Sequence, residues 1–227
     1  MSSKSPSIKI VFEDDFILAI DKPAGIPSCI LRQAQDDRES VEKWLQKKYP
    51  NVKLVHRLDN ETSGILIAAK TDTAFETLRA IWKTPQVTKK YTALVLGKTC
   101  ALGKITTPIA HHPRKKKKMM MGGKKARPTH TEFKTIKYFK NYSLLEVKIT
   151  TGVRHQIRIH LASIGHPLAG DQLYQKAKAR DRDRLNLNGH FLHLSTIEFP
   201  HPETGEMISL NSPLPKDLEI VLDSFLK

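Results

Sequence analysis

The sequence predicts a single α+β domain that covers residues 1–227. Short runs of alternating apolar and polar residues, typical of strands, occur along much of the chain, and segments with apolar residues at helical spacing lie between them. No internal repeat and no Pro/Gly/Ser-rich linker divides the 227 residues. The composition suits a globular domain, because 39% of the residues are hydrophobic and 27% are charged.

The strands are predicted from alternation and from the turn residues that end each run. A β-hairpin is expected first, where Glu13-Asp14-Asp15 separates residues 8–12 from residues 16–20. Thr62-Ser63-Gly64 is expected to form a tight turn before a short buried strand at 65–69. Further strands are predicted at 87–97, 131–140, 142–149, 191–199 and 207–210.

Four helices are predicted from apolar stripes and capping residues. The first follows Ser40 and ends at Pro50, the second begins with a capping box at 73–76, and the last begins with Pro215 at position N1. The third is expected within 153–164, where Arg154 and Arg158 are four residues apart and share one side. Two arginines on a mostly buried helix need anions, either carboxylates of the protein or phosphates.

The charge of the chain favours a polyanionic partner. Its net charge is +15 and its pI is about 9.8, values that most often indicate nucleic acid binding. Part of the excess lies in a segment at 99–127 that is expected to be loop-like, with a basic insertion at about 111–127. The run Lys115, Lys116, Lys117 and Lys118 within it is a solvated loop, a phosphate-binding loop, or both.

Several classes of protein are excluded by what the sequence lacks. No apolar run is long enough to span a bilayer, and the start of the chain has no apolar signal-peptide core. The ten histidines show no metal-ligand spacing, and no glycine-rich nucleotide-binding loop is present. Cys29 and Cys100 make no disulfide framework. We therefore expect a cytoplasmic monomer that binds no metal and needs no obligate protein partner.

The stretch from Val55 to Ile67 contains the strongest candidate for a functional carboxylate. Asp59 lies between two apolar runs, two residues after Arg57, on a loop that leads into a buried strand. Such a loop presents a carboxylate well to a ligand, although an aspartate that only caps a turn is a simpler alternative. Tyr91, on the strand predicted at 87–97, is by itself best explained as a core tyrosine with a satisfied hydroxyl.

Four ordered motifs carry a family resemblance. The segment 56–64 (HRLDNETSG) matches the signature H-R-L-D-x-x-T-S-G, and 21–25 (DKPAG) matches N-K-P-x-G with Asp in place of Asn. The strand segment 89–95 (KKYTALV) matches K-x-Y-x-A-x-V. Segments 155–161 (HQIRIHL) and 165–174 (GHPLAGDQLY) match the pair H-Q-I-R-x-H-L and G-H-P-I-x-G-D-x-x-Y. Together they resemble the RluA-type RNA pseudouridine synthases, in order from about residue 8 to residue 210.

The resemblance implies a pseudouridine synthase fold, with a mixed, mostly antiparallel central sheet flanked by helices and loops. It also implies an enzyme that breaks the N1–C1′ bond of a uridine, turns the base and rejoins it through C5, without a cofactor. Asp59 matches the catalytic carboxylate, Arg158 the arginine that pairs with it, and Tyr91 the tyrosine that packs on the base and helps to remove its C5 proton. A stacked base cannot reach a buried carboxylate, so the uridine must be flipped out.

Further residues are expected to bind RNA, because the resemblance or their charge points to it. Arg57 matches the arginine that helps to displace the target nucleotide. The others are His56, Thr62, Lys89, His155 and the run Lys115, Lys116, Lys117 and Lys118. Ribosomal and transfer RNA are both plausible substrates from the family.

Besides Asp21, the chain departs from the family pattern at two further positions. Arg154 is shifted by one residue from the first arginine of G-R-x-H-Q-I-R, and Gln175 follows Tyr174 where Gly is common. Many relatives carry an N-terminal S4-type RNA-binding module, which we do not expect here. The alternative function is a non-catalytic RNA-binding or ribosome-assembly protein on the same fold. A DNA-binding module is less favoured, because the sequence has no helix–turn–helix or zinc pattern.

Overall fold

The computed structural model describes residues 8–29, 39–180, 183–185 and 187–226. Its strands are β1 (Lys9–Glu13), β2 (Ile17–Lys22), β3 (Lys53–Leu54), β4 (Ser63–Ala69), β5 (Thr88–Leu96), β6 (Leu102–Ile105), β7 (Ile109–His111), β8 (Met119–Met121), β9 (Thr131–Tyr138), β10 (Tyr142–Ile149), β11 (Leu192–Pro200) and β12 (Met207–Asn211). Its helices are α1 (Val41–Lys48), α2 (Asp72–Ile81), α3 (Gln156–Ser163), α4 (Ala177–Arg180) and α5 (Lys216–Asp223). None of the helices in these ranges is long and apolar enough to cross a bilayer.

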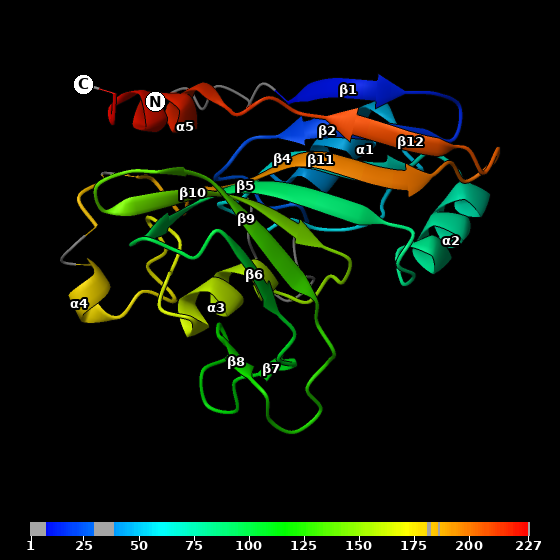
Figure 1. The fold of residues 1–227 in the computed structure, drawn as a ribbon. Helices are drawn as coiled ribbons and strands as arrows, with labels where there is room; N and C mark the ends of the chain where they lie inside the picture. The colour runs from blue at the N-terminus through cyan, green and yellow to red at the C-terminus, as the bar shows by residue number, and fades with distance from the viewer. Residues whose placement is uncertain (1–7, 30–38, 181–182, 186, 227) are drawn as a thin grey trace.

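A ten-stranded sheet forms the centre of the molecule (Figure 1). Eight strands follow the order β1-β2-β4-β11-β5-β10-β9-β6, while β12 pairs with β11 and β3 pairs with β4. The pairing of β4 with β11 is parallel, and the other strand pairs are antiparallel. The predicted α+β class with a mixed, mostly antiparallel sheet is therefore confirmed.

Most predicted elements are found close to their expected positions. The first hairpin is β1 and β2, and the paired strands expected at 131–140 and 142–149 are β9 and β10. Ser40 caps α1, because its hydroxyl oxygen accepts a hydrogen bond from the Lys43 N–H at 3.2 Å. On β5, every second residue from Val87 to Val95 is buried, which is the face that alternation predicted.

Four local predictions are wrong. The N-cap of α2 is Thr71 and not Thr73, since the Thr71 hydroxyl accepts from the Ala74 N–H at 3.1 Å. The segment 99–127 is not all loop, because β6 joins the main sheet beside β9, and β7 pairs with β8 in a small hairpin. Pro215 precedes α5 as its N-cap. Helix α3 begins at Gln156, so Arg154 lies before the helix and shares no helical face with Arg158.

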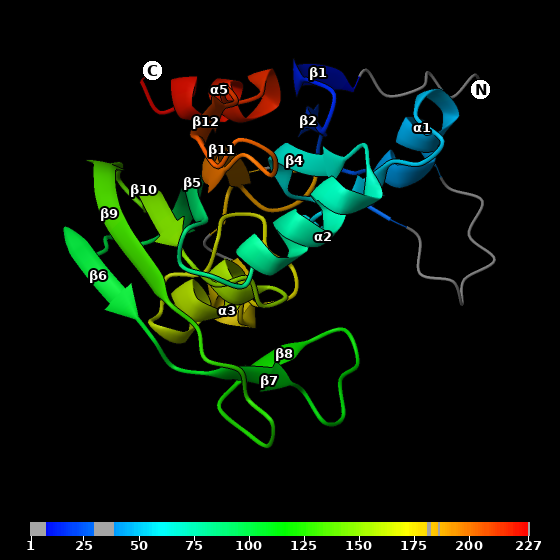
Figure 2. The same ribbon diagram turned by 90° about the vertical axis from the view of Figure 1, so that its right-hand side faces the viewer.

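The site is built on one side of the sheet. Helix α3 and the β7–β8 hairpin lie on that side, while α5 lies on the other, as both views show (Figures 1 and 2). Residues 156–161 of α3 are all buried. A helix that is buried all round must pair its polar groups internally. His160, for example, lies within 2.8 Å of the Thr131 hydroxyl and 3.1 Å of the Thr107 carbonyl.

Candidate active site

A buried lysine holds the loop that carries Asp59. The fully buried Lys22 ammonium donates hydrogen bonds to the carbonyl of Asn60 at 3.1 Å and to two carbonyls of its own 23–26 segment at 2.8 Å each. The Gly25 N–H also donates to the Asn60 carbonyl, at 2.8 Å. Burial lowers the pKa of Lys22 to about 7, although the Asp59 charge opposes this shift. The residue after Asp59 is thus fixed by the segment that matched the N-K-P-x-G motif.

Two further contacts hold the loop from either end. The Ser28 hydroxyl accepts from the Leu58 N–H at 3.1 Å and donates to the Leu58 carbonyl at 2.9 Å. On the other side, Gly64 lies within β4 with φ +112°, and a Cβ added there would overlap with the backbone of Leu194 on β11. Gly64 is therefore required for the close parallel approach of two strands, and the prediction that it forms a turn is wrong.

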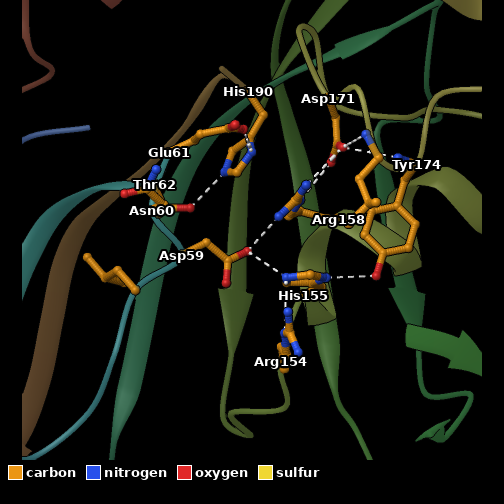
Figure 3. A network of polar contacts seen from close by, with 12 residues as sticks. Asp59, Asn60, Glu61, Thr62, Arg154, His155, Arg158, Asp171, Tyr174 and His190 are labelled. Atoms are coloured by element: carbon orange, nitrogen blue, oxygen red, sulfur yellow. Dashed lines mark hydrogen bonds and ion pairs between the residues drawn. The ribbon is translucent and has the colours of Figure 1, made fainter. Parts of the chain in front are cut away.

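Arg158 connects two carboxylates of very different exposure (Figure 3). Its Nη1 donates to Asp59 Oδ2 at 2.8 Å, while its Nε and Nη2 donate to the two oxygens of Asp171 at 2.7 and 3.0 Å. The side chains of Asp171 and Arg158 are 0% and 8% exposed, whereas that of Asp59 is 25% exposed. Asp171 holds the guanidinium in a bidentate pair, and Asp59 presents its carboxylate to solvent.

The surroundings of Asp59 keep it ionised. Burial alone would raise its pKa, but the charges of His155 and Arg158 and the Arg158 hydrogen bond outweigh burial and lower the pKa below its ordinary value. Burial lowers the pKa of His155 to about 4, so this imidazole is neutral at pH 7. At neutral pH the Arg158 cation therefore carries the effect. An ionised, partly exposed carboxylate in such a site is able to act as a nucleophile or a base.

His155 lies against the same carboxylate. Its Nε2 is 3.7 Å from Asp59 Oδ2, and its Nδ1 is 2.8 Å from the hydroxyl of Tyr174. The Tyr174 ring also lies near the guanidinium, 5.4 Å from Arg158 Cζ to the ring centre. The His155 side chain is only 7% exposed. Its place in the structure is beside the Asp59 carboxylate, and its predicted contact with RNA stays a prediction.

Tyr91 lies on β5, where it pairs with Leu194 of β11. It is 7% exposed, and its hydroxyl has no hydrogen-bond partner within the described ranges, so it is not a core tyrosine with a satisfied hydroxyl. Burial, followed by the negative charge of Asp59, raises its pKa well above the ordinary value. A phenol with a raised pKa stays protonated at neutral pH. It offers a ring and a donor to a ligand, and it would have to lose its own proton before it could accept one from C5.

Two residues predicted to contact RNA also support the protein's own packing. The Thr62 side chain is buried, and its hydroxyl lies 2.7 Å from Nε2 of His190. The His56 Nε2 accepts from the Ile67 N–H at 3.1 Å, and its ring stacks on Trp82 with 5.4 Å between ring centres. His56 thus ties the Asp59 loop to β4, and Thr62 ties it to the residue His190 before β11. Their contact with RNA stays a prediction.

The other cationic candidates differ in exposure. Lys89 is 6% exposed, and burial lowers its pKa to about 8. Arg57 is exposed beside Cys29, with 3.9 Å between its Nη1 and the Cys29 sulfur. Lys115, Lys116 and Lys117 are exposed and Lys118 is half-buried, in the loop that joins β7 to β8. Within the described ranges, these four lysines form no ion pair.

Comparison with known proteins decides the family. Residues 16–163 match the family model described as RNA pseudouridylate synthase. The chain belongs to this family. It is 35% identical to the ribosomal large subunit pseudouridine synthase D of Nitrosomonas europaea, over 96% of this chain and 65% of that protein. It is 36% identical to an uncharacterized RNA pseudouridine synthase of Chloroflexus aurantiacus, over 89% of this chain and 64% of that protein. The chain thus spans about 65% of the length of these two relatives.

A solved structure agrees on the fold of this pseudouridylate synthase family. Human RNA pseudouridylate synthase domain containing 1 aligns over 100% of this chain and 98% of its own, with a TM-score of 0.77 and 21% identity. Asp59, Tyr91 and Arg158 lie inside the matched residues 16–163, whereas Asp171 and Tyr174 lie outside them. No cluster of three or more potential metal ligands occurs in the part of the chain that the structure describes.

Sequence reasoning missed the partners that complete the site. Asp171 and Tyr174 appear in the sequence only as letters of the G-D-x-x-Y motif, and Lys22 only as part of the N-K-P-x-G segment. The sequence did contain one signal for these partners, because a buried arginine needs carboxylates or phosphates. In the structure Arg158 pairs with two carboxylates.

Proposed function

We propose that this chain isomerises uridine in RNA to pseudouridine, with Asp59 as the catalytic carboxylate. The observation that carries the proposal is the ionised, partly exposed Asp59, held by an arginine that the buried Asp171 fixes from behind. A purely RNA-binding protein would gain nothing from such an arrangement, because a carboxylate near phosphates repels them and a buried ion cluster is costly to build.

The reaction exchanges one glycosidic bond for another. The N1–C1′ bond breaks, the base turns, a C5–C1′ bond forms, C5 loses its proton and N1 gains one. Asp59 is ionised and can act as a base, and a flipped-out nucleotide would come within its reach. Attack on C1′, addition to the base and removal of a ribose proton are all open to this carboxylate. Tyr91 supports the base with its ring, because its raised pKa keeps it a phenol.

We infer that the substrate is ribosomal or transfer RNA, and we favour large-subunit ribosomal RNA because two relatives carry names of that specificity. Arg57 and the lysines of the β7–β8 loop supply exposed positive charge for the phosphate backbone. We further infer a cytoplasmic monomer, to be tested by fractionation and by sedimentation. The free thiols of Cys29 and Cys100 are compatible with a reducing compartment.

The proposal is tested by the release of tritium from RNA labelled at uridine C5. Purified protein is incubated with ribosomal RNA and with transfer RNA, and the exchanged tritium is counted. Release from one of them establishes the chemistry and the substrate class together. Tight binding without release from either RNA would favour the alternative, a non-catalytic RNA-binding or ribosome-assembly protein.

A further inference from the structure

His155 and Tyr174 form a hydrogen-bonded pair beside Asp59, and the sequence predicted only RNA contact for His155 and no role for Tyr174. The pair lies between two parts of the molecule. One end is His155 Nε2, 3.7 Å from Asp59 Oδ2. The other is the Tyr174 hydroxyl, which accepts a hydrogen bond from the backbone N–H of Met119 on β8 at 2.9 Å. A continuous chain of polar contacts therefore runs from the β7–β8 hairpin to the Asp59 carboxylate, and Figure 3 shows its part from Tyr174 to Asp59.

The direction of the hydrogen bonds follows from the donors available. The Tyr174 oxygen already accepts from the Met119 N–H, and its own proton is free for His155 Nδ1 at 2.8 Å. A neutral imidazole that accepts at Nδ1 carries its proton at Nε2, the nitrogen that faces Asp59. Such an N–H faces Asp59 Oδ2, the oxygen that also accepts from Arg158 Nη1, so both groups restrain the carboxylate through one oxygen.

An exposed arginine also contacts this nitrogen. Arg154 Nε is 3.4 Å from His155 Nε2, a long contact made by a solvent-exposed side chain. An arginine N–H can only donate, so this contact is a hydrogen bond only in the tautomer that leaves Nε2 unprotonated. Phosphates attract arginine strongly, because the guanidinium matches their oxygens in a bidentate manner. RNA that draws Arg154 away would therefore favour the tautomer with the proton on Nε2, facing Asp59.

The backbone of His155 is held in an unusual conformation. Its φ is +55°, a left-handed value that few residues other than glycine adopt. This conformation is strained and persists where the surrounding structure requires it, often at a functional site. It also turns the ring towards Asp59 immediately before α3 begins.

The hairpin end of the chain is firmly packed. Ile109 and Met119 of the hairpin form a buried cluster with Val153 and Ile159, and the Tyr174 ring packs against it. Lys118, the last lysine of the basic loop, lies with its Nζ 5.8 Å from the centre of the Tyr174 ring. A shift of the loop on binding RNA would therefore reach Tyr174 directly.

We propose that His155, oriented by Tyr174, is a positioning residue that holds the Asp59 carboxylate for reaction and couples it to the packing of the β7–β8 hairpin. The inference rests on the proposed function and deepens it. It predicts that the two residues act as one unit in the chemical step and contribute little to RNA affinity.

The test removes one oxygen atom. Tyr174→Phe should lower the single-turnover rate of tritium release about 10- to 100-fold, the usual loss when a group that orients a functional residue is removed. RNA affinity should stay within about twofold. Tyr138→Phe is the matched control, because that hydroxyl on β9 bonds only to the Thr99 carbonyl. An unchanged rate in Tyr174→Phe would overturn the proposal.

A double-mutant cycle asks whether the pair acts as a unit. His155→Asn keeps a residue that tolerates positive φ, yet its shorter side chain cannot bridge Tyr174 and Asp59. We expect the double variant His155→Asn/Tyr174→Phe to be about as slow as His155→Asn alone. Additive losses would mean that the two side chains act independently, which contradicts the proposal.

A measurement without RNA separates this inference from the proposed function. ¹⁵N shifts of the His155 ring at pH 7 report which nitrogen carries the proton. The wild type should show the proton on Nε2, and Tyr174→Phe should mix the two tautomers. A proton on Nδ1 in the wild type would overturn the inference even if tritium is released. The predicted tautomer in a protein that releases no tritium would contradict only the proposed function.

Discussion

At the scale of single residues, Arg158 explains how an aspartate can be both ionised and available. The guanidinium makes two hydrogen bonds to the unexposed Asp171 and one to Asp59. Asp171 also accepts from the backbone N–H groups of Leu173 and Tyr174, at 2.9 and 3.1 Å. The hydrogen bonds of Asp171 are therefore complete without Asp59. One oxygen of Asp59 makes no hydrogen bond to Arg158 and would be available to a substrate.

Arg158→Lys tests this arrangement, because a lysine keeps the charge but has no planar fork to reach both carboxylates. Losing a charged hydrogen bond of about 1.5–3 kcal/mol should slow the chemical step roughly 10- to 100-fold. In the wild type, the Arg158 hydrogen bond helps to lower the Asp59 pKa, so losing it in the variant should move the acid limb of the pH–rate profile to higher pH. Arg79→Lys, on the exposed face of α2, is the control. An acid limb that stays in place would show that Arg158 does not set this pKa.

The residue scale also shows where sequence reasoning stops. Asp59 and Arg158 were named from motifs, but their contact joins positions 99 residues apart and became visible only in the fold. Thr62 and His56 belong to the same motif as Asp59, yet their partners, His190 and Ile67, turn them into supports of the loop. A motif identifies a residue type that is needed; it does not separate the groups that face the ligand from those that hold them.

At the scale of elements, strands with a simple alternation were predicted well and the short strands beside the basic loop were not. Burial alternates over 88–93 of β5 and over 143–149 of β10, because one face of each strand packs in the core. β7 and β8 have three residues each, and the run of lysines between them carries no periodicity. Their pairing depends on contacts with α3 and Tyr174 that no local pattern contains.

The parallel contact of β4 and β11 is the most demanding element-scale feature near the site. Gly64→Ala should lower the free energy of unfolding by more than about 2 kcal/mol, because positive φ adds strain to the overlap with the Leu194 backbone. Gly205→Ala is the matched control, since its φ is +73° and a Cβ there has nothing within 4 Å. Urea denaturation of both variants measures the difference. Equal losses would mean that the strands separate easily at this point.

At the scale of the whole molecule, the effect of the net charge of +15 on RNA binding depends on where the basic residues lie. The β7–β8 loop and α3 lie on one side of the sheet, the side of Asp59, and α5 lies on the other (Figure 1). In the proposed function, this basic loop on the side of Asp59 would hold the RNA backbone while the base is flipped.

The four lysines of the β7–β8 loop are tested by replacing them with glutamine, at Lys115, Lys116, Lys117 and Lys118. This variant should bind RNA more weakly. The slope of log affinity against log salt concentration should also become shallower, by roughly one for each phosphate that the loop no longer neutralises. Affinity is measured at several salt concentrations for this variant and for Lys216→Gln on α5, which should keep the wild-type slope. If the loop variant keeps that slope as well, these lysines are only a solvated surface.

Buried histidines should make the whole fold sensitive to mild acid. Burial lowers the pKa of His155 to about 4 and lowers the pKa values of His56, His160 and His193 as well. From pH 6.5 to pH 4 the unfolded chain therefore binds protons that the folded chain does not, and stability falls as the pH falls. His155 alone should account for about 3 kcal/mol of this loss.

The carboxylates act at lower pH. The pKa values of Asp59 and Asp171 are lowered, so their stabilising effect is lost only as the pH falls below about 3.8. Denaturant midpoints at pH 7.5, 6 and 5 should therefore decrease steadily. A constant midpoint over this range would show that the histidines titrate normally in the folded protein.

The catalytic role of Asp59 is tested most directly by the single-turnover release of tritium by Asp59→Asn, compared with the wild type on the same C5-labelled RNA. Asparagine has nearly the same shape but is neither a nucleophile nor a base, and Asp72→Asn, on the exposed start of α2, is the matched control. We expect no release by Asp59→Asn, RNA affinity within a few-fold of wild type, and full release by Asp72→Asn. Substantial release by Asp59→Asn would remove this carboxylate from the chemistry.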